Sequence, residues 1–311
     1  MNENVHHDDR TVNMQVKSLS DNEIQSLLGK YGVRPNKKLG QSFLKSRAVA
    51  RDIVAAADVT RNDTVLEVGG GLGILTEEIA HRAGHVHVIE LEAGLARALR
   101  DLLREHENVT VIEGDALVIA LPETTKVVSN LPYSISSEIT FRLLREHKFD
   151  QAVLMYQKEF AQRLRADPGT QDYSRLTINI RYQAEVDFLM KVPATMFFPM
   201  PEVESVVVRM KHRTQGPRAK RDDVFHWMVT GLYSYPNKNL RKALGIWFRN
   251  IGVEKSLAEE IVHNCLGHPK GDDRLRNISI EDLVVLADSI LGSIEEGRIP
   301  DPRGLRSERA S

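Results

Sequence analysis

The segment TVLEVGGGLGILTEEIA, from Thr64 to Ala80, joins three patterns that together decide the fold. Its first part, Thr64–Val68, is mostly apolar or β-branched and predicts a short strand. Further on, Leu75 and Ile79 fall on one face of a helix. The glycines between these two elements let the backbone turn sharply and let a ligand approach it closely. The segment therefore predicts a strand, a turn and a helix, with a nucleotide-like ligand at the turn.

The same alternation of strand and helix continues along the chain. Four further strands are predicted from short apolar runs, at His85–Glu90, Val109–Asp115, Lys126–Asn130 and Asp150–Tyr156. Strands that alternate with helices favour a parallel sheet covered on both faces. Two later runs, Val186–Val192 and Ser205–Met210, are expected to extend one edge of the sheet in antiparallel fashion. The expected class is α/β with a Rossmann-like sheet.

Beyond the sheet, the texture of the sequence becomes helical. A linker with glycine and proline occupies Lys211–Asp223. Helices are predicted after it, near Val224–Tyr235, Leu240–Asn250, Ser256–Cys265 and Ser279–Leu291. We therefore expect a polar N-terminal extension over 1–36, to which no role is assigned. A catalytic domain over 37–211, a smaller all-helical domain over 212–294 and a charged tail over 295–311 are expected to follow.

Composition limits the classes of function. An apolar fraction of 41% in 311 residues supports a globular core. Because the net charge is −1, a polyanion can be bound only by a local basic patch and not by the surface as a whole. Cys265 is the only cysteine, so no intrachain disulfide can form. No apolar run approaches the roughly 18 residues of a membrane span. We therefore expect a cytoplasmic protein. At the N-terminus, the pair His6-His7 is interpreted as part of a disordered polar terminus rather than as a metal site.

The spacing of the glycines indicates the kind of ligand. Gly69, Gly71 and Gly73 follow the pattern G-x-G-x-G, whereas a dinucleotide fingerprint needs G-x-G-x-x-G. The observed pattern resembles the first motif of S-adenosylmethionine-dependent methyltransferases. Glu90 ends the second strand and can accept hydrogen bonds from both ribose hydroxyls, while Asp115 can accept one from an adenine amino group. An NAD-dependent oxidoreductase would also use Glu90, so these acids alone leave both cofactors open.

The segment SNLPY, which ends at Tyr133, favours methyl transfer to an adenine amine. The lone pair of that amine is delocalised into the ring, so acceptors on its N–H groups are needed to favour a tetrahedral nitrogen. Asn130 offers a side-chain oxygen, and the Leu131-Pro132 segment offers a backbone carbonyl whose direction the proline ring restricts. Tyr133 offers a ring on which a flipped base can stack. An oxidoreductase gives this segment no task.

Eight motifs in this order identify a resemblance that covers about Lys37 to Leu291. They read KKLGQSFL, LEVGGGLG, VIELE, EGDAL, SNLPYSISS, MYQKEFAQRL, FFPMPEVES and NKNLRKAL. The chain resembles the ribosomal RNA adenine N6,N6-dimethyltransferases, in particular their archaeal and eukaryotic branch. The resemblance implies a class I methyltransferase fold and S-adenosylmethionine as the cofactor. It also implies dimethylation of two adjacent adenosines near the 3′ end of small-subunit rRNA, with a part in small-subunit biogenesis.

The resemblance also assigns roles to residues of this chain. It implies that Gln41, Ser42 and Leu44 hold the methionine end of the cofactor. Gly69 and Gly71 would line it, Glu90 would hold the ribose and Asp115 the adenine, and Asn130 would bridge cofactor and target. Phe197 matches the aromatic residue that stacks on the second face of the target base, with core packing as the alternative. Ser42 and Gly70 depart from the residues that are common in the family.

Positive charge is concentrated in one part of the chain. From Lys211 to Arg249 there are nine basic and two acidic residues, a net charge of +7. Lys238, Arg241 and Lys242 share one face if the helix at Leu240–Asn250 begins a turn earlier, and we expect them to dock on rRNA. A solvated basic face is the alternative.

Two rival functions stay open beside the expected one. The chain could be a non-catalytic rRNA-binding assembly factor, or an adenine methyltransferase that acts on another RNA, such as the large-subunit rRNA. The expected partner is the immature small ribosomal subunit. We expect a monomer, with no metal and no membrane association.

Overall fold

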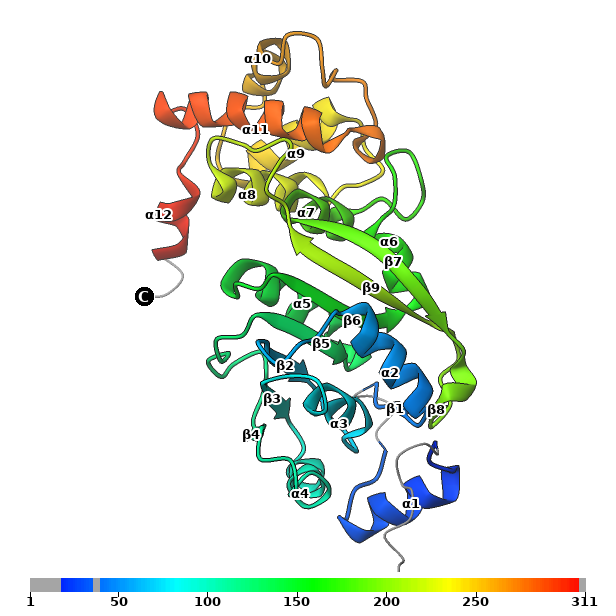
Figure 1. Cartoon of the computed structure of the whole chain (residues 1–311). Coiled ribbons are helices and arrows are strands. Elements are labelled where there is room, and N and C mark those ends of the chain that lie inside the picture. The colour runs from blue at the N-terminus through cyan, green and yellow to red at the C-terminus, as the bar shows by residue number, and fades with distance from the viewer. Residues whose placement is uncertain (1–17, 36–39, 308–311) are drawn as a thin grey trace, which may run out of the picture. The chain divides into compact units, whose positions relative to one another are not determined.

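The computed structural model describes residues 18–35 and 40–307, with side chains described to Gly304. These residues form two compact units, which we treat separately (Figure 1). The first comprises the described parts of Met1–Arg142 together with His147–Gln157 and Phe188–Arg209. The second comprises Leu143–Glu146, Lys158–Asp187 and the described part of Met210–Ser311. It thus includes Lys158–Asp187, which the sequence analysis assigns to the catalytic domain over 37–211.

The sheet has seven strands in the order β4-β3-β2-β5-β6-β9-β7. All five strands that the sequence predicts for its parallel part are present: β2 (Thr64–Val68), β3 (His85–Glu90), β4 (Val109–Glu113), β5 (Lys126–Asn130) and β6 (Gln151–Gln157). Their neighbouring pairs are parallel. Because parallel strands end at the same edge, the segments that follow β2, β3, β4 and β5 gather there.

The last two strands complete the sheet at the β6 side. They are β7 (Ala184–Val192) and β9 (Ser205–His212), and Figure 1 draws their arrows in opposite directions. The expected antiparallel addition is therefore present. Since β9 runs to His212 and the next helix begins at Asp222, the linker is shorter than the predicted Lys211–Asp223.

Three helices of the first unit pack on the sheet or beside it. They are α2 (Arg47–Ala56), α3 (Ile74–Ala80) and α4 (Ala93–Leu102). Ile53 of α2 and Ile79 of α3 are fully buried in one core together with the strands, and Leu99 of α4 packs on Val88. Next to Asn130 the chain continues through a short 3-10 turn into α5 (Ser136–Glu146).

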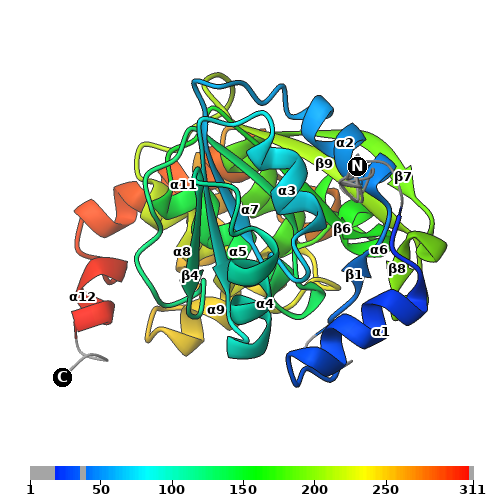
Figure 2. The same cartoon turned by 60° about the horizontal axis from the view of Figure 1, so that its bottom comes forward.

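The expected polar extension contains a helix that the sequence analysis does not predict, within the described residues 18–35. Helix α1 (Asp21–Lys30) begins with a capping box in which Ser20 accepts from the Glu23 N–H and the Glu23 carboxylate accepts from the Ser20 N–H. Ile24 and Leu28 are buried in one cluster with Leu95 and Ala98 of α4. Figure 2 shows helix α1 near α4. The His6-His7 pair lies outside the described residues.

A two-stranded sheet joins distant parts of the first unit. Strand β1 (Phe43–Leu44) pairs in antiparallel fashion with β8 (Phe197–Phe198), and Leu44 lies opposite Phe197. The segment GQSFL is thereby tied to the segment FFPMP, which is more than 150 residues away in the chain. This pairing fixes which aromatic residue of β8 faces the core.

The second unit is helical over most of its described residues. It contains α6 (Lys158–Leu164), α7 (Arg175–Gln183), α8 (Asp222–Leu232), α9 (Leu240–Asn250), α10 (Leu257–Asn264), α11 (Ile280–Glu295) and α12 (Pro302–Ser307). Its core includes Phe225, Phe248 and Tyr182, whose ring stacks on Phe225 with the centroids 3.9 Å apart. The segment expected as a charged tail is anchored in part, since Asp301 forms an ion pair with Arg221 at 2.7 Å. No helix among the described residues is long and apolar enough to cross a membrane.

Candidate active site

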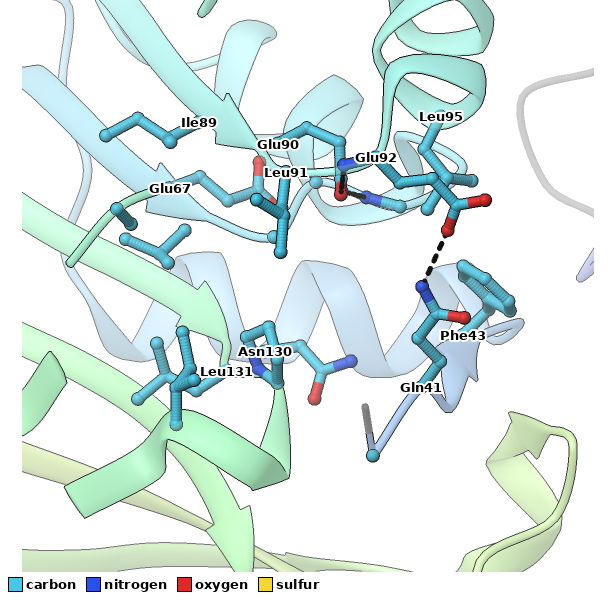
Figure 3. A pocket seen from close by; sticks show the side chains of 18 of the residues that line it. Gln41, Phe43, Glu67, Ile89, Glu90, Leu91, Glu92, Leu95, Asn130 and Leu131 are labelled. Atoms are coloured by element: carbon cyan, nitrogen blue, oxygen red, sulfur yellow. Dashed lines mark hydrogen bonds between the residues drawn. The ribbon is translucent and has the colours of Figure 1, made fainter. Parts of the chain in front are cut away.

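A cavity of about 390 Å³ lies at the carboxyl ends of the parallel strands, within the first unit. It is lined by residues of five short segments and by Arg34. Figure 3 shows side chains from these segments pointing into one space. The segments lie within 40–44, 67–75, 89–95, 114–116 and 130–135. Of the predicted cofactor and catalytic residues, this arrangement brings together all but Phe197.

The glycine-rich turn forms one wall of the cavity. Gly69 and Gly71 have φ angles of +80° and +57°, a region that side chains other than glycine disfavour. A Cβ atom on Gly69 would lie 3.0 Å from Cδ of Pro132, and one on Gly71 would lie 3.0 Å from Cδ1 of Phe43. Both glycines are therefore needed for the backbone conformation and for the close approach of neighbouring segments.

Glu90 lies at the end of β3 and is 6% exposed. Its Oε2 accepts from the Gly71 N–H at 3.0 Å and its Oε1 accepts from the Glu92 N–H at 3.1 Å (Figure 3). Burial raises the pKa of Glu90, while these backbone donors oppose the shift. Since each carboxylate oxygen has a second lone pair, Glu90 can still accept hydrogen bonds from a ligand.

Asp115 lines the cavity two residues beyond the end of β4. Its Oδ1 accepts from the Leu117 N–H at 2.8 Å, which fixes the loop after the strand. The other oxygen, Oδ2, remains for a ligand. The strand predicted at Val109–Asp115 ends earlier, at Glu113, but Asp115 still lines the cavity.

Asn130 closes β5 and has an amide group whose orientation the structure fixes. Nδ2 donates to the carbonyl oxygen of Ser42 at 3.3 Å. Only the NH₂ group can donate to a carbonyl, so Oδ1 is directed elsewhere. Oδ1 is buried and has no hydrogen-bond partner among the described residues. Buried acceptors are normally paired, so this atom marks a place where a donor of a ligand is expected.

The residues after Asn130 hold the remaining parts of the predicted site. The Pro132 carbonyl accepts from the Ile135 N–H at 3.2 Å, which leaves the Leu131 carbonyl as the backbone acceptor of the segment. The Tyr133 hydroxyl is 2.6 Å from Oγ of Ser205, so the ring is anchored at its far end. Burial raises the pKa of Tyr133, and the group stays neutral at physiological pH.

The GQSFL segment faces the SNLPY segment across the cavity. Gly40 has a φ angle of +64°, and a Cβ atom there would lie 3.0 Å from the Ser134 nitrogen. Gln41 donates from Nε2 to Oε2 of Glu92 at 2.9 Å (Figure 3). Ser42 contributes its carbonyl, because its Oγ donates to the Pro199 carbonyl at 3.2 Å. The buried Leu44 lines the cavity with apolar surface.

Phe197 is the predicted catalytic residue that the structure places elsewhere. It is 1% exposed, packs in the core of the first unit and does not line the cavity. Its neighbour Phe198 is partly exposed. Successive side chains of a strand point to opposite sides, so the pairing of Phe197 with Leu44 sends one aromatic ring inward and the next one outward. Here the structure favours core packing, the alternative reading of Phe197.

Three charged residues of the cavity were missed from the sequence: Glu67, Glu92 and Arg34. Glu67 is 1% exposed, and its Oε2 has no hydrogen-bond partner among the described residues. Burial raises the pKa of Glu67 to about 8, and the neighbouring Glu90 carboxylate adds to the shift. The acid that directly precedes the glycines is the signal that could have indicated Glu67. Nothing local distinguishes Arg34 from other basic residues of the N-terminal segment.

The residues predicted to dock on rRNA belong to the second unit. Helix α9 begins at Leu240, as predicted, with Asn239 accepting from the Lys242 N–H. Lys238 therefore precedes the helix, and the earlier start that would place the three residues on one helix face is absent. Arg241 is held in ion pairs with Glu259 at 2.9 Å and Asp272 at 3.7 Å. Lys238, Arg241 and Lys242 are all exposed. Because the two acids balance the charge of Arg241, we keep the two lysines as the first candidates for docking, and the role of Arg241 stays a prediction.

The cavity fits a nucleoside ligand that carries hydrogen-bond donors and a positive charge. Three acids, Glu67, Glu90 and Asp115, lie along its wall, and Oε2 of Glu67 and Oδ1 of Asn130 are acceptors without a described partner. The glycine turn provides a surface that a ribose and its substituents can approach closely. S-adenosylmethionine has hydroxyls, an adenine amine, an ammonium group and a sulfonium centre that match this set.

Comparison with known proteins indicates the same class of enzyme. A family model described as ribosomal RNA adenine dimethylase matches residues 32–270. A relative from Methanosarcina acetivorans carries the name "Probable ribosomal RNA small subunit methyltransferase A". It is 42% identical over 268 residues, 86% of this chain and 97% of the relative. A relative of the same name from Methanosarcina mazei is 46% identical over 221 residues, which is 71% of this chain and 81% of the relative.

Two solved structures are similar over most of the chain. A dimethyladenosine transferase from Plasmodium falciparum aligns with a TM-score of 0.72 and 26% identity, over 83% of this chain and 99% of that one. The 23S rRNA methyltransferase ErmE aligns with a TM-score of 0.59 and 28% identity, over 79% of this chain and 98% of that one. Both share the α/β fold described above.

Proposed function

The chain belongs to the ribosomal RNA adenine dimethylase family, and from that premise we propose how its residues perform the reaction and on which RNA. It is an S-adenosylmethionine-dependent rRNA adenine dimethyltransferase. We infer that the targets are two adjacent adenosines near the 3′ end of small-subunit rRNA. The small subunit is favoured because relatives named for it are 42% and 46% identical, against 28% for the 23S rRNA methyltransferase ErmE.

One observation carries the proposed chemistry. Oδ1 of Asn130 is a buried acceptor without a described partner, and the hydrogen bond to Ser42 fixes its direction. S-adenosylmethionine, when bound, supplies an electrophilic methyl group on a sulfonium centre. Asn130 accepts from one N–H of the target amine and the Leu131 carbonyl accepts from the other, which favours a tetrahedral nitrogen and stabilises the charge that develops on it.

The target base is held by stacking and by restricted geometry. Tyr133 presents its ring to one face of the base, and the hydrogen bond to Ser205 fixes the ring's tilt. No strong general base is needed, because the amine proton becomes acidic once nitrogen gains the methyl group. After the first transfer one N–H remains, which Asn130 or the Leu131 carbonyl can hold for the second transfer.

The cofactor roles follow from the places of the acids. We assign the ribose hydroxyls to Glu90 and the adenine amino group to Asp115, in line with their strand-end positions. Glu67, buried beside Glu90, is assigned to the positively charged end of the cofactor. Gln41 and Leu44 enclose the methionine part, whereas Ser42 contributes its carbonyl to Asn130.

The proposed partner is the immature small ribosomal subunit, on which the enzyme acts as a monomer in the cytoplasm. The exposed Lys238 and Lys242 are the proposed phosphate contacts. A role in small-subunit biogenesis belongs to the same proposal. The main rival is an assembly factor that binds rRNA without transferring methyl groups.

Transfer of labelled methyl groups tests this function. The protein is incubated with labelled S-adenosylmethionine and either immature small subunits or large subunits, and titration calorimetry compares binding of S-adenosylmethionine with that of NAD. We expect label in small-subunit rRNA and no NAD binding. Binding to the particle without label in its rRNA supports the assembly factor instead, and label confined to the large subunit identifies a different substrate.

A further inference from the structure

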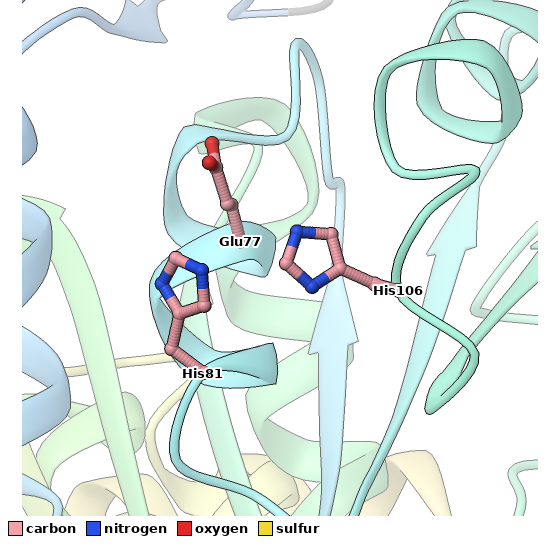
Figure 4. A group of neighbouring side chains, drawn as sticks. All are labelled: Glu77, His81 and His106. Carbon is pink, nitrogen blue, oxygen red and sulfur yellow. The ribbon is translucent and has the colours of Figure 1, made fainter. Parts of the chain in front are cut away.

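Two histidines and one glutamate gather on the surface of the first unit, away from the cavity. Glu77 lies in α3, and His81 is the residue directly after the end of that helix. The two residues are four apart, so they share one face of the helix. His106 comes from the turn between α4 and β4. One ligand atom from each of the three side chains lies within 4.8 Å of the other two (Figure 4). None of the three residues lines the cavity.

Hydrogen bonds connect the end of helix α3 to the turn that carries His106. The Asn108 side chain donates from Nδ2 to the carbonyl oxygens of Ala80 at 2.9 Å and Ala83 at 3.1 Å, which caps the C-terminal end of α3. The Asn108 carbonyl accepts from the Val86 N–H at 2.8 Å, which ties the same residue to β3. The turn with His106 is thus held against the end of α3 by two hydrogen bonds of Asn108 and against β3 by a third.

The three side chains are placed as ligands would be. The rings of His81 and His106 are 5.1 Å apart between centroids, and their nitrogens make no hydrogen bond to another described residue. Glu77 is oriented by Arg47, whose Nη2 is 2.6 Å from Oε2 of the carboxylate. The other carboxylate oxygen remains for a ligand. Such an outer partner is typical of carboxylates that bind metals.

We propose that Glu77, His81 and His106 form a site for a divalent transition metal, with Zn²⁺ as the fitting ion. Two imidazole nitrogens and one carboxylate oxygen suit Zn²⁺, and a water completes a tetrahedron. Ca²⁺ and Mg²⁺ prefer oxygen ligands throughout and do not fit. At Zn–ligand distances of about 2.0–2.2 Å the ligand atoms lie about 3.4 Å apart, so the exposed His81 closes on the ion by a rotation of its side chain.

The site acts on stability rather than on the methyl transfer. It links the C-terminal end of α3 to the turn before β4, while the opposite end of α3 begins at Gly73 in the glycine-rich turn. An ion bound only by the folded chain stabilises that fold by mass action. The metal therefore steadies the helix on whose first turn the cofactor cavity depends.

Metal binding to the full, metal-stripped chain tests the site. Titration calorimetry with Zn²⁺ and the visible absorption of Co²⁺ measure affinity and geometry, and thermal unfolding with and without Zn²⁺ measures the stabilisation. We expect one Zn²⁺ per chain, a tetrahedral Co²⁺ spectrum and a higher melting temperature with Zn²⁺. His81→Ala and His106→Ala should each lower the affinity by about tenfold or more, whereas Asn108→Ala, which removes no ligand, should lower it less.

Two control variants separate this site from other histidines. His85→Ala changes a histidine of β3 that belongs to no such group, and His6→Ala with His7→Ala removes the N-terminal pair. Both should bind Zn²⁺ like the parent. The proposal is overturned if the parent binds less than one Zn²⁺ per chain or if His81→Ala and His106→Ala keep the parent's affinity. Loss of binding in the N-terminal variant would overturn it equally.

Discussion

The Nδ2 atom of Asn130 donates a hydrogen bond to the carbonyl oxygen of Ser42 at 3.3 Å. This contact joins the end of β5 to a segment 88 residues earlier and leaves Oδ1 of Asn130 buried without a described partner. The Nδ2 end of this amide group thus connects two segments of the site, while its Oδ1 end has no described partner. The Oδ1 end is where the target amine is expected to bind.

Asn130→Ala should slow methyl transfer much more than it weakens cofactor binding. Loss of one positioned acceptor typically lowers a rate by on the order of 100-fold or more. Single-turnover rates measure the transfer, and calorimetry measures the affinity for S-adenosylmethionine. A variant that keeps the parent's single-turnover rate would remove Asn130 from the mechanism.

Gly69→Ala should weaken cofactor binding as well as stability. The φ angle of +80° strains any other residue, and the new Cβ would press on Pro132 at 3.0 Å. We expect a loss of about 1–2 kcal/mol in unfolding free energy, together with weaker binding. Gly32→Ala is the matched control, since Gly32 has a φ angle of +70° and no atom within 4 Å of an added Cβ. The control should lose stability alone; equal affinity losses in both variants would contradict the assignment.

Glu67 should make the stability of the cofactor-free protein fall as pH rises. Its folded pKa is raised from 4.5 to about 8, so the folded state binds more protons than the unfolded state between these values. Stability from this group is complete below about pH 4.5 and is lost through pH 8, at no more than about 1.4 kcal/mol per pH unit. Glu90 shifts in the same direction, so the test is the difference between parent and Glu67→Gln. Denaturant unfolding from pH 5 to 8 should show a shallower pH dependence in the variant, and parallel curves would contradict the prediction.

Lys238 and Lys242 should contribute to rRNA binding, whereas Arg241 should not. Replacing both lysines by Ala should weaken binding to the small subunit and reduce the log–log salt slope by roughly 0.7–0.9 for each lost phosphate contact. Arg241→Ala breaks ion pairs with Glu259 and Asp272 and should lower the melting temperature instead. Binding measured across a salt series decides. If the double lysine variant matches the parent at every salt concentration, this docking surface is wrong.

Much of the site could be predicted because its residues follow strands that the sequence marks clearly. Asn130, Glu90 and Asp115 each come at or just after a short apolar run, and parallel strands bring their ends together. The glycines of LEVGGGLG are equally visible, since their spacing differs from the dinucleotide pattern. Local patterns alone therefore predict the α/β class, and the structure confirms it.

What the sequence could not show depends on partners that lie far away in the chain. Which of Phe197 and Phe198 faces the core depends on pairing with β1, which no local pattern contains. Arg241 reads as a free cation until Glu259 and Asp272 are known to lie beside it. Helix α1 has only a few apolar residues and gains its stability from packing on α4.

Nucleoside analysis of rRNA tests the central claim most directly. Immature small subunits are incubated to completion with S-adenosylmethionine and either the parent or Asn130→Ala, and the digested rRNA is examined by mass spectrometry. With the parent we predict N6,N6-dimethyladenosine at two adjacent positions, because one N–H remains for Asn130 or the Leu131 carbonyl after the first transfer. With the variant we predict a large loss of product at early times. Only monomethyladenosine at completion, or no methylated adenosine in small-subunit rRNA, would contradict the account.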